Sequence, residues 1–105
     1  MQQQNEVYDI VLANGRVIDP ETYLDGKFNV GIKGDRIMAV SKEPLTGKEV
    51  IDVAGLIVSP GFIDTHAHGQ SIPSNRMQAY DGVTTVLELE VGILPVAEFY
   101  ENTAK

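Results

Sequence analysis

The segment from Pro60 to Gly69 limits what this chain can fold into more than any other stretch. It begins as an apolar run and ends in His66 and His68, the only two histidines of the sequence. Side chains alternate between the two faces of an extended strand, so both imidazoles and the carboxyl group of Asp64 are expected on one face. Two neutral imidazoles on one face are able to bind a single divalent ion. The alternative is that both histidines are exposed loop residues without a shared ligand.

The residues before this segment show signals for strands and tight turns and none for a helix. Asn14-Gly15 is a strong hairpin signal, because both positions of such a turn need φ > 0, and Gly34-Asp35 suits a second two-residue turn. Strands are expected over residues 7–13, 16–18, 28–32, 37–40, 50–53 and 56–58. We therefore predict that residues 7–58 form antiparallel hairpins, as in a small sheet or half of a sandwich.

The pattern changes after Gly69. A helix over residues 74–80 is expected to be capped by Ser74 and to end near Gly82, and the β-branched residues 83–87 predict a strand. Pro95 suits the first turn of a second helix that runs to the end of the chain. One face of that helix is expected to contain Val96, Phe99, Tyr100 and Thr103. With a first strand at residues 61–65, the order strand, helix, strand, helix is typical of a parallel α/β sheet.

Two motifs, in this order, resemble the amidohydrolase superfamily, which includes dihydroorotase, hydantoinase and D-aminoacylase. The first resembles the family's entry segment into the barrel, and the second resembles its second barrel strand. The first covers residues 55–68 (GLIVSPGFIDTHAH) and the second residues 81–86 (DGVTTV). The resemblance implies an α/β protein with a β-rich N-terminal part. Residues 1–60 would form a small, partial β-sandwich subdomain, and residues 61–105 the first two β/α units of a metal-dependent TIM-type (β/α)8 barrel. Since such a barrel needs ~250 residues, the chain would be the N-terminal portion of an enzyme.

The resemblance also implies a role for the two histidines. His66 and His68 would bind a divalent ion, most often zinc, at the C-terminal mouth of the barrel. The ion would polarise a carbonyl group and lower the pKa of bound water. A catalytic zinc site usually keeps three protein ligands, and the family supplies its other ligands and its general base from later strands. The catalytic base is therefore expected beyond residue 105, and the 105-residue chain alone is expected to be inactive.

Glu88 and Glu90 follow the second α/β strand and share one of its faces. Either is a candidate metal ligand, because barrels of this type keep their chemistry at the C-terminal ends of the strands. In the D-aminoacylase branch a cysteine near this position contacts metal, whereas this chain has no cysteine. The alternative is that both glutamates are solvated.

Three further residues are weaker candidates. Asp64 is expected either to accept a hydrogen bond from a histidine ring nitrogen, as residues behind metal ligands do, or to be satisfied by backbone amides. Gln70 directly follows the histidine segment and is a candidate for substrate contact. Arg76 would bind a substrate carboxylate or simply lie on a helix surface.

The charge composition excludes some partners. Eight basic and 15 acidic residues give a net charge of −7, which argues against nucleic acid or an anionic membrane as a partner. The absence of cysteine excludes disulfides and thiolate metal sites. There is no apolar run near the ~20 residues of a membrane span and no signal-peptide pattern at the start. A cytoplasmic location is expected.

The resemblance implies hydrolysis of a non-peptide C–N bond, in an amide or a cyclic amide, with a small-molecule amide as substrate. The glycine at position 92 and the pair Gly69-Gln70 favour a D-aminoacylase-like N-acyl-D-amino-acid deacylase, while dihydroorotase or hydantoinase chemistry stays open. The alternative is a non-catalytic truncated product or scaffold that binds partners. Unfinished sheet edges would serve such binding, or the formation of oligomers.

Overall fold

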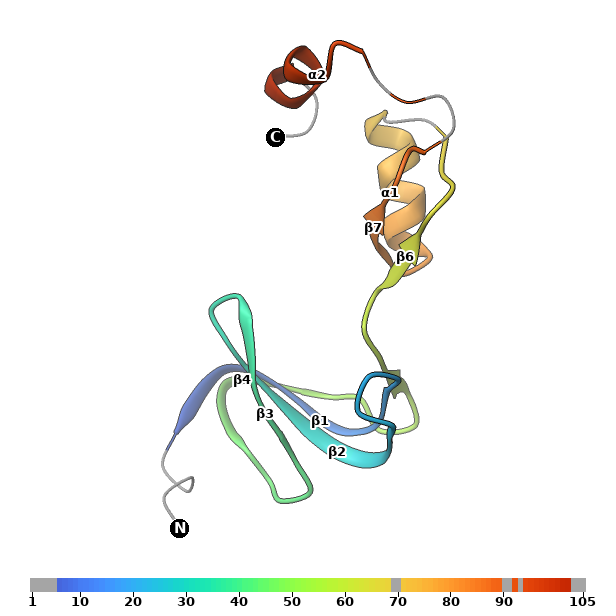
Figure 1. Ribbon diagram of the computed structural model, residues 1–105. Helices are drawn as coiled ribbons and strands as arrows, with labels where there is room; N and C mark the ends of the chain where they lie inside the picture. Colours follow the sequence, from blue (N-terminus) through green and yellow to red (C-terminus); the bar gives the residue numbers. More distant parts are fainter. Residues whose placement is uncertain (1–5, 69–70, 90–91, 93, 103–105) are drawn as a thin grey trace. The chain divides into compact units, whose positions relative to one another are not determined.

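The computed structural model of the 105-residue chain describes residues 6–68, 71–89, 92 and 94–102 (Figure 1). The chain divides into two compact units, Met1–Pro60 and Gly61–Lys105. The strands of the first unit are β1 (Val7–Asp19), β2 (Leu24–Lys33), β3 (Arg36–Ser41), β4 (Thr46–Asp52) and β5 (Ile57–Val58). The elements of the second unit are β6 (Phe62–Asp64), α1 (Ile72–Tyr80), β7 (Val83–Val86) and α2 (Val96–Asn102).

The first unit is a sheet with the strand order β3-β2-β1-β4, in which β5 also pairs with β1. As predicted, its described residues contain no helix. The prediction of antiparallel pairing throughout is wrong, because β4 and β5 both run parallel to β1. A tight turn dictates antiparallel pairing only for the two strands that it joins. Residues 42–45 connect β3 to β4, which pairs with the free edge of β1. No tight turn joins β4 to β1, so tertiary packing decides the direction in which β4 runs.

The predicted hairpin at Asn14-Gly15 is also wrong. β1 continues through both residues, and its pairing with β2 shifts register there, which makes the site a β-bulge. Asn14 has φ of 66°, and its backbone N–H donates to Oδ1 of Asn29 at 2.9 Å. A Cβ atom on Gly15 would lie 2.8 Å from a methyl group of Val58, so this glycine allows β5 to approach. The two residues thus have the conformational freedom of a turn, but long-range pairing on both sides keeps the strand extended.

The second predicted hairpin is confirmed. β2 and β3 pair antiparallel, with Gly34-Asp35 as the connecting residues and Gly34 at φ of 59°. The first chain reversal, by contrast, lies at residues 20–23, directly after β1. There Asp19 accepts hydrogen bonds from the backbone N–H of Glu21 and from the hydroxyl of Thr22, at 3.1 and 2.6 Å.

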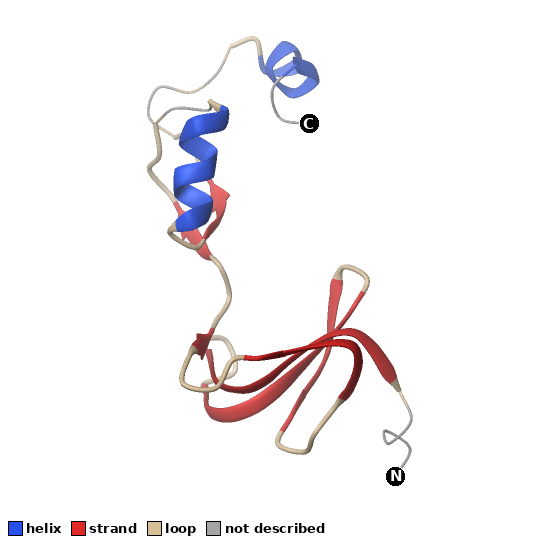
Figure 2. Cartoon of the chain, turned by 180° about the vertical axis from the view of Figure 1, so that it is seen from behind, coloured by secondary structure: helices blue, strands red, loops and turns tan. Residues whose placement is uncertain are grey.

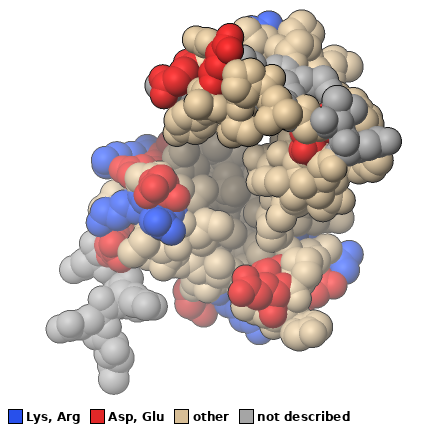
Figure 3. All heavy atoms as spheres, turned by 45° about the horizontal axis from the view of Figure 1, so that its top comes forward, with Lys and Arg blue, Asp and Glu red and all other residues tan. Residues whose placement is uncertain are grey.

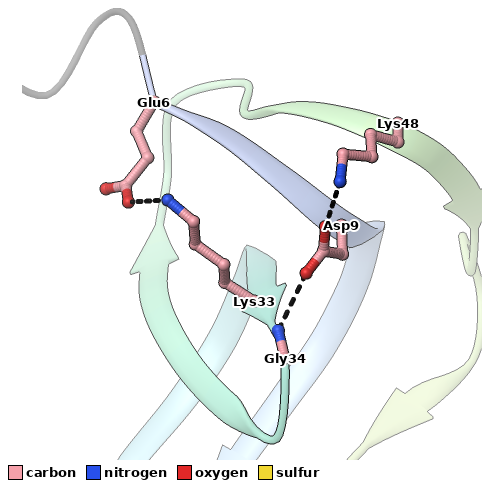
Figure 4. A network of polar contacts seen from close by, with 5 residues as sticks. All are labelled: Glu6, Asp9, Lys33, Gly34 and Lys48. Carbon is pink, nitrogen blue, oxygen red and sulfur yellow. Dashed lines mark hydrogen bonds and ion pairs between the residues drawn. The ribbon is translucent and has the colours of Figure 1, made fainter.

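The core of the first unit is small, and charged contacts tie its strands together. Its buried apolar side chains are Tyr8, Val11, Val17 and Val30. Asp9 on β1 accepts a hydrogen bond from Lys48 Nζ on β4 at 2.7 Å and another from the N–H of Gly34 at 2.8 Å (Figure 4). These two contacts hold the pKa of Asp9 below its usual value, with Lys48 as the largest cause.

Two further ion pairs connect β2 with β1 or with the residue directly before β1. Lys33 Nζ lies 3.0 Å from Glu6 Oε1 beside the Asp9 contacts (Figure 4). Arg16 on β1 donates two hydrogen bonds to Asp25 on β2, both at 2.7 Å, which lowers the pKa of that carboxyl group. On the face drawn in Figure 3, basic side chains lie beside acidic ones.

The second unit begins with a parallel strand pair. β6 and β7 run parallel and are connected through α1, as the sequence pattern predicts (Figure 2). Ala67 is buried, and α1 packs against β7. The described residues do not by themselves make a barrel, which needs eight such units. Within the described ranges, no helix has the length and apolar character needed to cross a membrane.

The first helix starts earlier than predicted. Ser71, not Ser74, is its N-cap, and the Ser71 hydroxyl accepts a hydrogen bond from the Ser74 backbone N–H at 3.4 Å. Pro73 has no N–H to donate, so it belongs in the first helical turn and moves the start of the helix back. The end is as predicted, with Gly82 at φ of 84°. α2 ends at Asn102 in the structure, and Thr103 lies outside the described residues.

Candidate metal centre

The pairing of β6 with β7 positions the histidine segment. The hydrogen bonding continues past both strand ends, because Leu87 donates its N–H to the Asp64 carbonyl at 2.8 Å and Ala67 donates to the Leu87 carbonyl at 3.2 Å. At the other end of the pair, a Cβ atom on Gly61 would collide with the side chain of Thr84. Glycine is therefore needed for the two strands to approach each other. The segment after β6 is held beside the segment after β7.

His66 and His68 come together, as predicted, although both lie in the segment that follows β6 and not within the strand. Ala67 between them is 4% exposed, and the two histidines are on the solvent side. Their Nε2 atoms lie 3.1 Å apart, and their ring centroids are 5.0 Å apart with an interplanar angle of 69°. One nitrogen from each ring thus faces the other, at a distance that also suits a hydrogen bond between the two rings.

The separation of the two nitrogens fits a shared zinc ion. Two nitrogens bound at ~2.0–2.1 Å to one tetrahedral zinc lie about 3.3 Å apart, and the observed 3.1 Å requires only a small adjustment. Among the described residues, no group of three or more His, Cys, Asp or Glu side chains is arranged to hold a metal. The described residues therefore bring two ring nitrogens together at this position, and a metal bound there would need further ligands.

Glu88 lies next to this pair. Its side chain is 10% exposed, and its Oε2 atom is 3.6 Å from Nδ1 of His68. The glutamate thus faces the ring nitrogen that points away from His66. The other candidate of this segment, Glu90, lies outside the described residues, as does Gln70.

Asp64 and Arg76 have simpler surroundings. Oδ1 of Asp64 accepts the backbone N–H of His66 at 3.0 Å. This is the backbone-amide alternative, and it fixes the local turn that presents His66. Arg76 is exposed on α1, in keeping with the interpretation as a helix-surface residue.

The backbone contacts of Ala67 and Leu87 were not foreseen from the sequence. The signal that would have found them is the strand register: Asp64 is paired with Val86, so continuing both strands by two residues brings His66 level with Glu88. Because side chains alternate along an extended segment, the two histidines and Glu88 are then expected on the same side of the paired segments.

Comparison with known proteins identifies the family. A sequence profile of the amidohydrolase family matches residues 49–103, more than half of the chain. The chain belongs to the amidohydrolase family. A D-aminoacylase from Alcaligenes xylosoxydans xylosoxydans is 34% identical over 97 residues, covering 88% of this chain and 20% of that protein. A dihydroorotase from Clostridium acetobutylicum is 39% identical over 89 residues, covering 74% of this chain and 21% of its own length.

A solved amidohydrolase structure matches as well. The N-acyl-D-glutamate deacylase from Bordetella bronchiseptica, in complex with zinc and a phosphonate inhibitor that mimics the tetrahedral intermediate, superposes with a TM-score of 0.68. It is 28% identical, and the match covers 79% of this chain and 19% of that one. This amidohydrolase chain spans about a fifth of the length of the curated relatives it matches.

Proposed function

We propose that this chain supplies the N-terminal part of a metal-dependent amidohydrolase that hydrolyses a non-peptide C–N bond in a small amide. Residues 1–60 contribute the β-rich subdomain, and residues 61–105 the first two β/α units of a (β/α)8 barrel. The observation that carries the proposal is the 3.1 Å approach of the His66 and His68 Nε2 atoms just past the C-terminal end of β6. In barrels of this kind the chemistry lies at that end of the strands.

Each residue of the segment has a distinct task. His66 and His68 hold a divalent ion, most often zinc in this family, through their Nε2 atoms. Asp64 fixes the turn by accepting the His66 N–H, and buried Ala67 anchors the backbone between the two ligands. A divalent ion bound there supplies a Lewis acid that polarises the substrate carbonyl and lowers the pKa of water.

The exposed apolar surface of the second unit supports the barrel interpretation. Phe62 and Ile63 on β6 and Ile72 and Met77 on α1 are all more than half exposed in this chain. Parallel α/β sheets are normally covered on both faces. In the proposed barrel, later β/α units pack against these side chains.

Within the amidohydrolases, we propose an N-acyl-D-amino-acid substrate. The 34% identity to a D-aminoacylase and the structural match to an N-acyl-D-glutamate deacylase support this choice. The identity of 39% to a dihydroorotase over a shorter segment keeps a cyclic amide as the second candidate. A non-catalytic scaffold has less support, because the relatives that the chain matches include a D-aminoacylase and a dihydroorotase.

Zinc titration of the 105-residue chain tests the proposal. We expect calorimetry to show one zinc ion per chain, with binding lost in both His66→Ala and His68→Ala. Tyr80→Ala is the matched control, since it removes an exposed ring from the same unit and should leave binding unchanged. Histidine variants that bind zinc as well as the wild-type chain does would refute the proposal.

A further inference from the structure

The position of Glu88 beside His68 assigns it a task that the sequence left open. The glutamate was a candidate metal ligand on the basis of its place after β7. In the structure, its carboxylate faces Nδ1 of His68 at 3.6 Å, whereas Nε2 of the same ring faces His66 at 3.1 Å. The two nitrogens of an imidazole point in different directions. A carboxylate on the Nδ1 side is therefore poorly placed to share an ion with both Nε2 atoms.

The same position is well suited to orienting the ring. A neutral imidazole carries its proton on one nitrogen and a lone pair on the other, and the hydrogen bond at one nitrogen selects the tautomer. At 3.6 Å, Oε2 of Glu88 and Nδ1 of His68 are further apart than in a direct hydrogen bond. A carboxylate carries negative charge and can only accept hydrogen bonds, so it still favours the proton on the near nitrogen, Nδ1 of His68. The Nε2 lone pair then stays directed toward His66, where an ion would lie.

The surroundings of Glu88 favour a fixed carboxylate. Its side chain is only 10% exposed, and a carboxylate that is largely removed from water requires a partner. Two backbone hydrogen bonds, from Leu87 to Asp64 and from Ala67 to Leu87, hold the segments before Glu88 and before His68 side by side. The distance between the glutamate and the ring is thus set by the backbone of both segments.

We propose that Glu88 is a positioning residue that holds His68 in the Nδ1-protonated tautomer and leaves Nε2 for the metal ion. This inference rests on the proposed function and adds to it a residue that acts through a ligand. Without an ion, His66 completes the arrangement by donating its own Nε2–H to Nε2 of His68. Carboxylates behind histidine ligands raise ligand basicity and fix the ring, and their loss typically weakens metal affinity by ~10–100-fold.

Two measurements on the 105-residue chain test the inference. The first is the tautomer of His68 without metal at pH 8, read from the ring nitrogen chemical shifts. We expect the wild-type ring to be protonated on Nδ1, and the Nε2-protonated form to increase in Glu88→Ala. The second is zinc affinity by calorimetry, which we expect to fall ~10–100-fold in Glu88→Ala and by less in Glu88→Gln, whose amide oxygen is also able to accept a hydrogen bond from Nδ1–H.

The controls separate this role from a structural one. Glu98→Ala removes an exposed carboxylate from the same unit and should change neither measurement. Glu88→Gln preserves the size of the side chain, and amide proton–nitrogen spectra show whether each variant stays folded. With cobalt(II) as probe, Glu88→Ala should keep the wild-type visible spectrum at saturation, because no ligand is lost.

Three results would overturn the inference. A cobalt spectrum that changes in Glu88→Ala would make Glu88 a ligand. An unchanged tautomer and an unchanged zinc affinity, with wild-type binding intact, would overturn the positioning role alone. Zinc binding that both His66→Ala and His68→Ala retain would overturn the proposed function together with this inference.

Discussion

The close approach of β6 and β7 at Gly61 leads to the most demanding prediction. A Cβ atom added at Gly61 would lie 2.7 Å from Cβ of Thr84 and closer still to its Oγ1 and Cγ2 atoms. Ordinary contact begins at 3.4 Å, so the strands must separate by at least about 0.7 Å, the difference between these two distances. Overpacking of this kind costs ~1–3 kcal/mol. Weakening the hydrogen bond from Phe62 N–H to the Gly82 carbonyl adds ~0.5–1.5 kcal/mol.

We therefore expect Gly61→Ala to destabilise the second unit by about 2–4 kcal/mol and to weaken zinc binding, since the histidine segment follows β6 directly. Hydrogen exchange of the Phe62 amide reports the stability of this pair, and calorimetry reports the zinc affinity. Thr84→Gly in the same chain should restore most of the loss because it removes all three clashing atoms, and Thr84→Ala should restore less. Wild-type protection of the Phe62 amide in Gly61→Ala would refute the reasoning.

Three further predictions concern the core, the pH dependence and the activity. Val11→Ala should destabilise the first unit by about 2 kcal/mol in denaturant unfolding, because it removes two methyl groups from a side chain that is 1% exposed. A change in the free energy of unfolding below ~0.5 kcal/mol would contradict the place of Val11 in the core. Lys48 lowers the pKa of Asp9, and Arg16 lowers the pKa of Asp25. Both contacts therefore stabilise the folded chain at neutral pH. This stabilisation is lost as the pH falls, first below the ordinary aspartate pKa of the unfolded chain and then through the lower pKa of the folded chain. Asp9→Asn should flatten this acid dependence of the unfolding midpoint, and an unchanged profile would argue against the network. The 105-residue chain with zinc should not hydrolyse N-acetyl-D-amino acids, because two ligands without a general base leave the reacting groups unpositioned; turnover that His66→Ala abolishes would contradict this.

The sequence by itself determined the features that depend on neighbouring residues. The Gly34-Asp35 turn follows from the conformational freedom of its residues and the short distance between the strands that it joins. The strand–helix–strand order of the second unit follows from periodicity and end signals. The approach of His66 and His68 is predicted by their spacing of two residues, although both lie just past the end of β6. In each case the information lies within a few residues of the feature, so no knowledge of the rest of the fold is needed.

Tertiary structure decided the features that depend on distant residues. Asn14-Gly15 has the composition of a turn, yet it is a bulge because β2 pairs with β1 on both sides of it. β4 and β5 run parallel to β1, which no local pattern in 46–58 specifies. Glu88 was one of two candidate ligands, and only the register of β6 against β7 places its carboxylate at Nδ1 of His68. Local sequence limits the conformations that each segment can adopt. Which strand pairs with which depends on the relative stability of the alternative pairings in the complete folded chain.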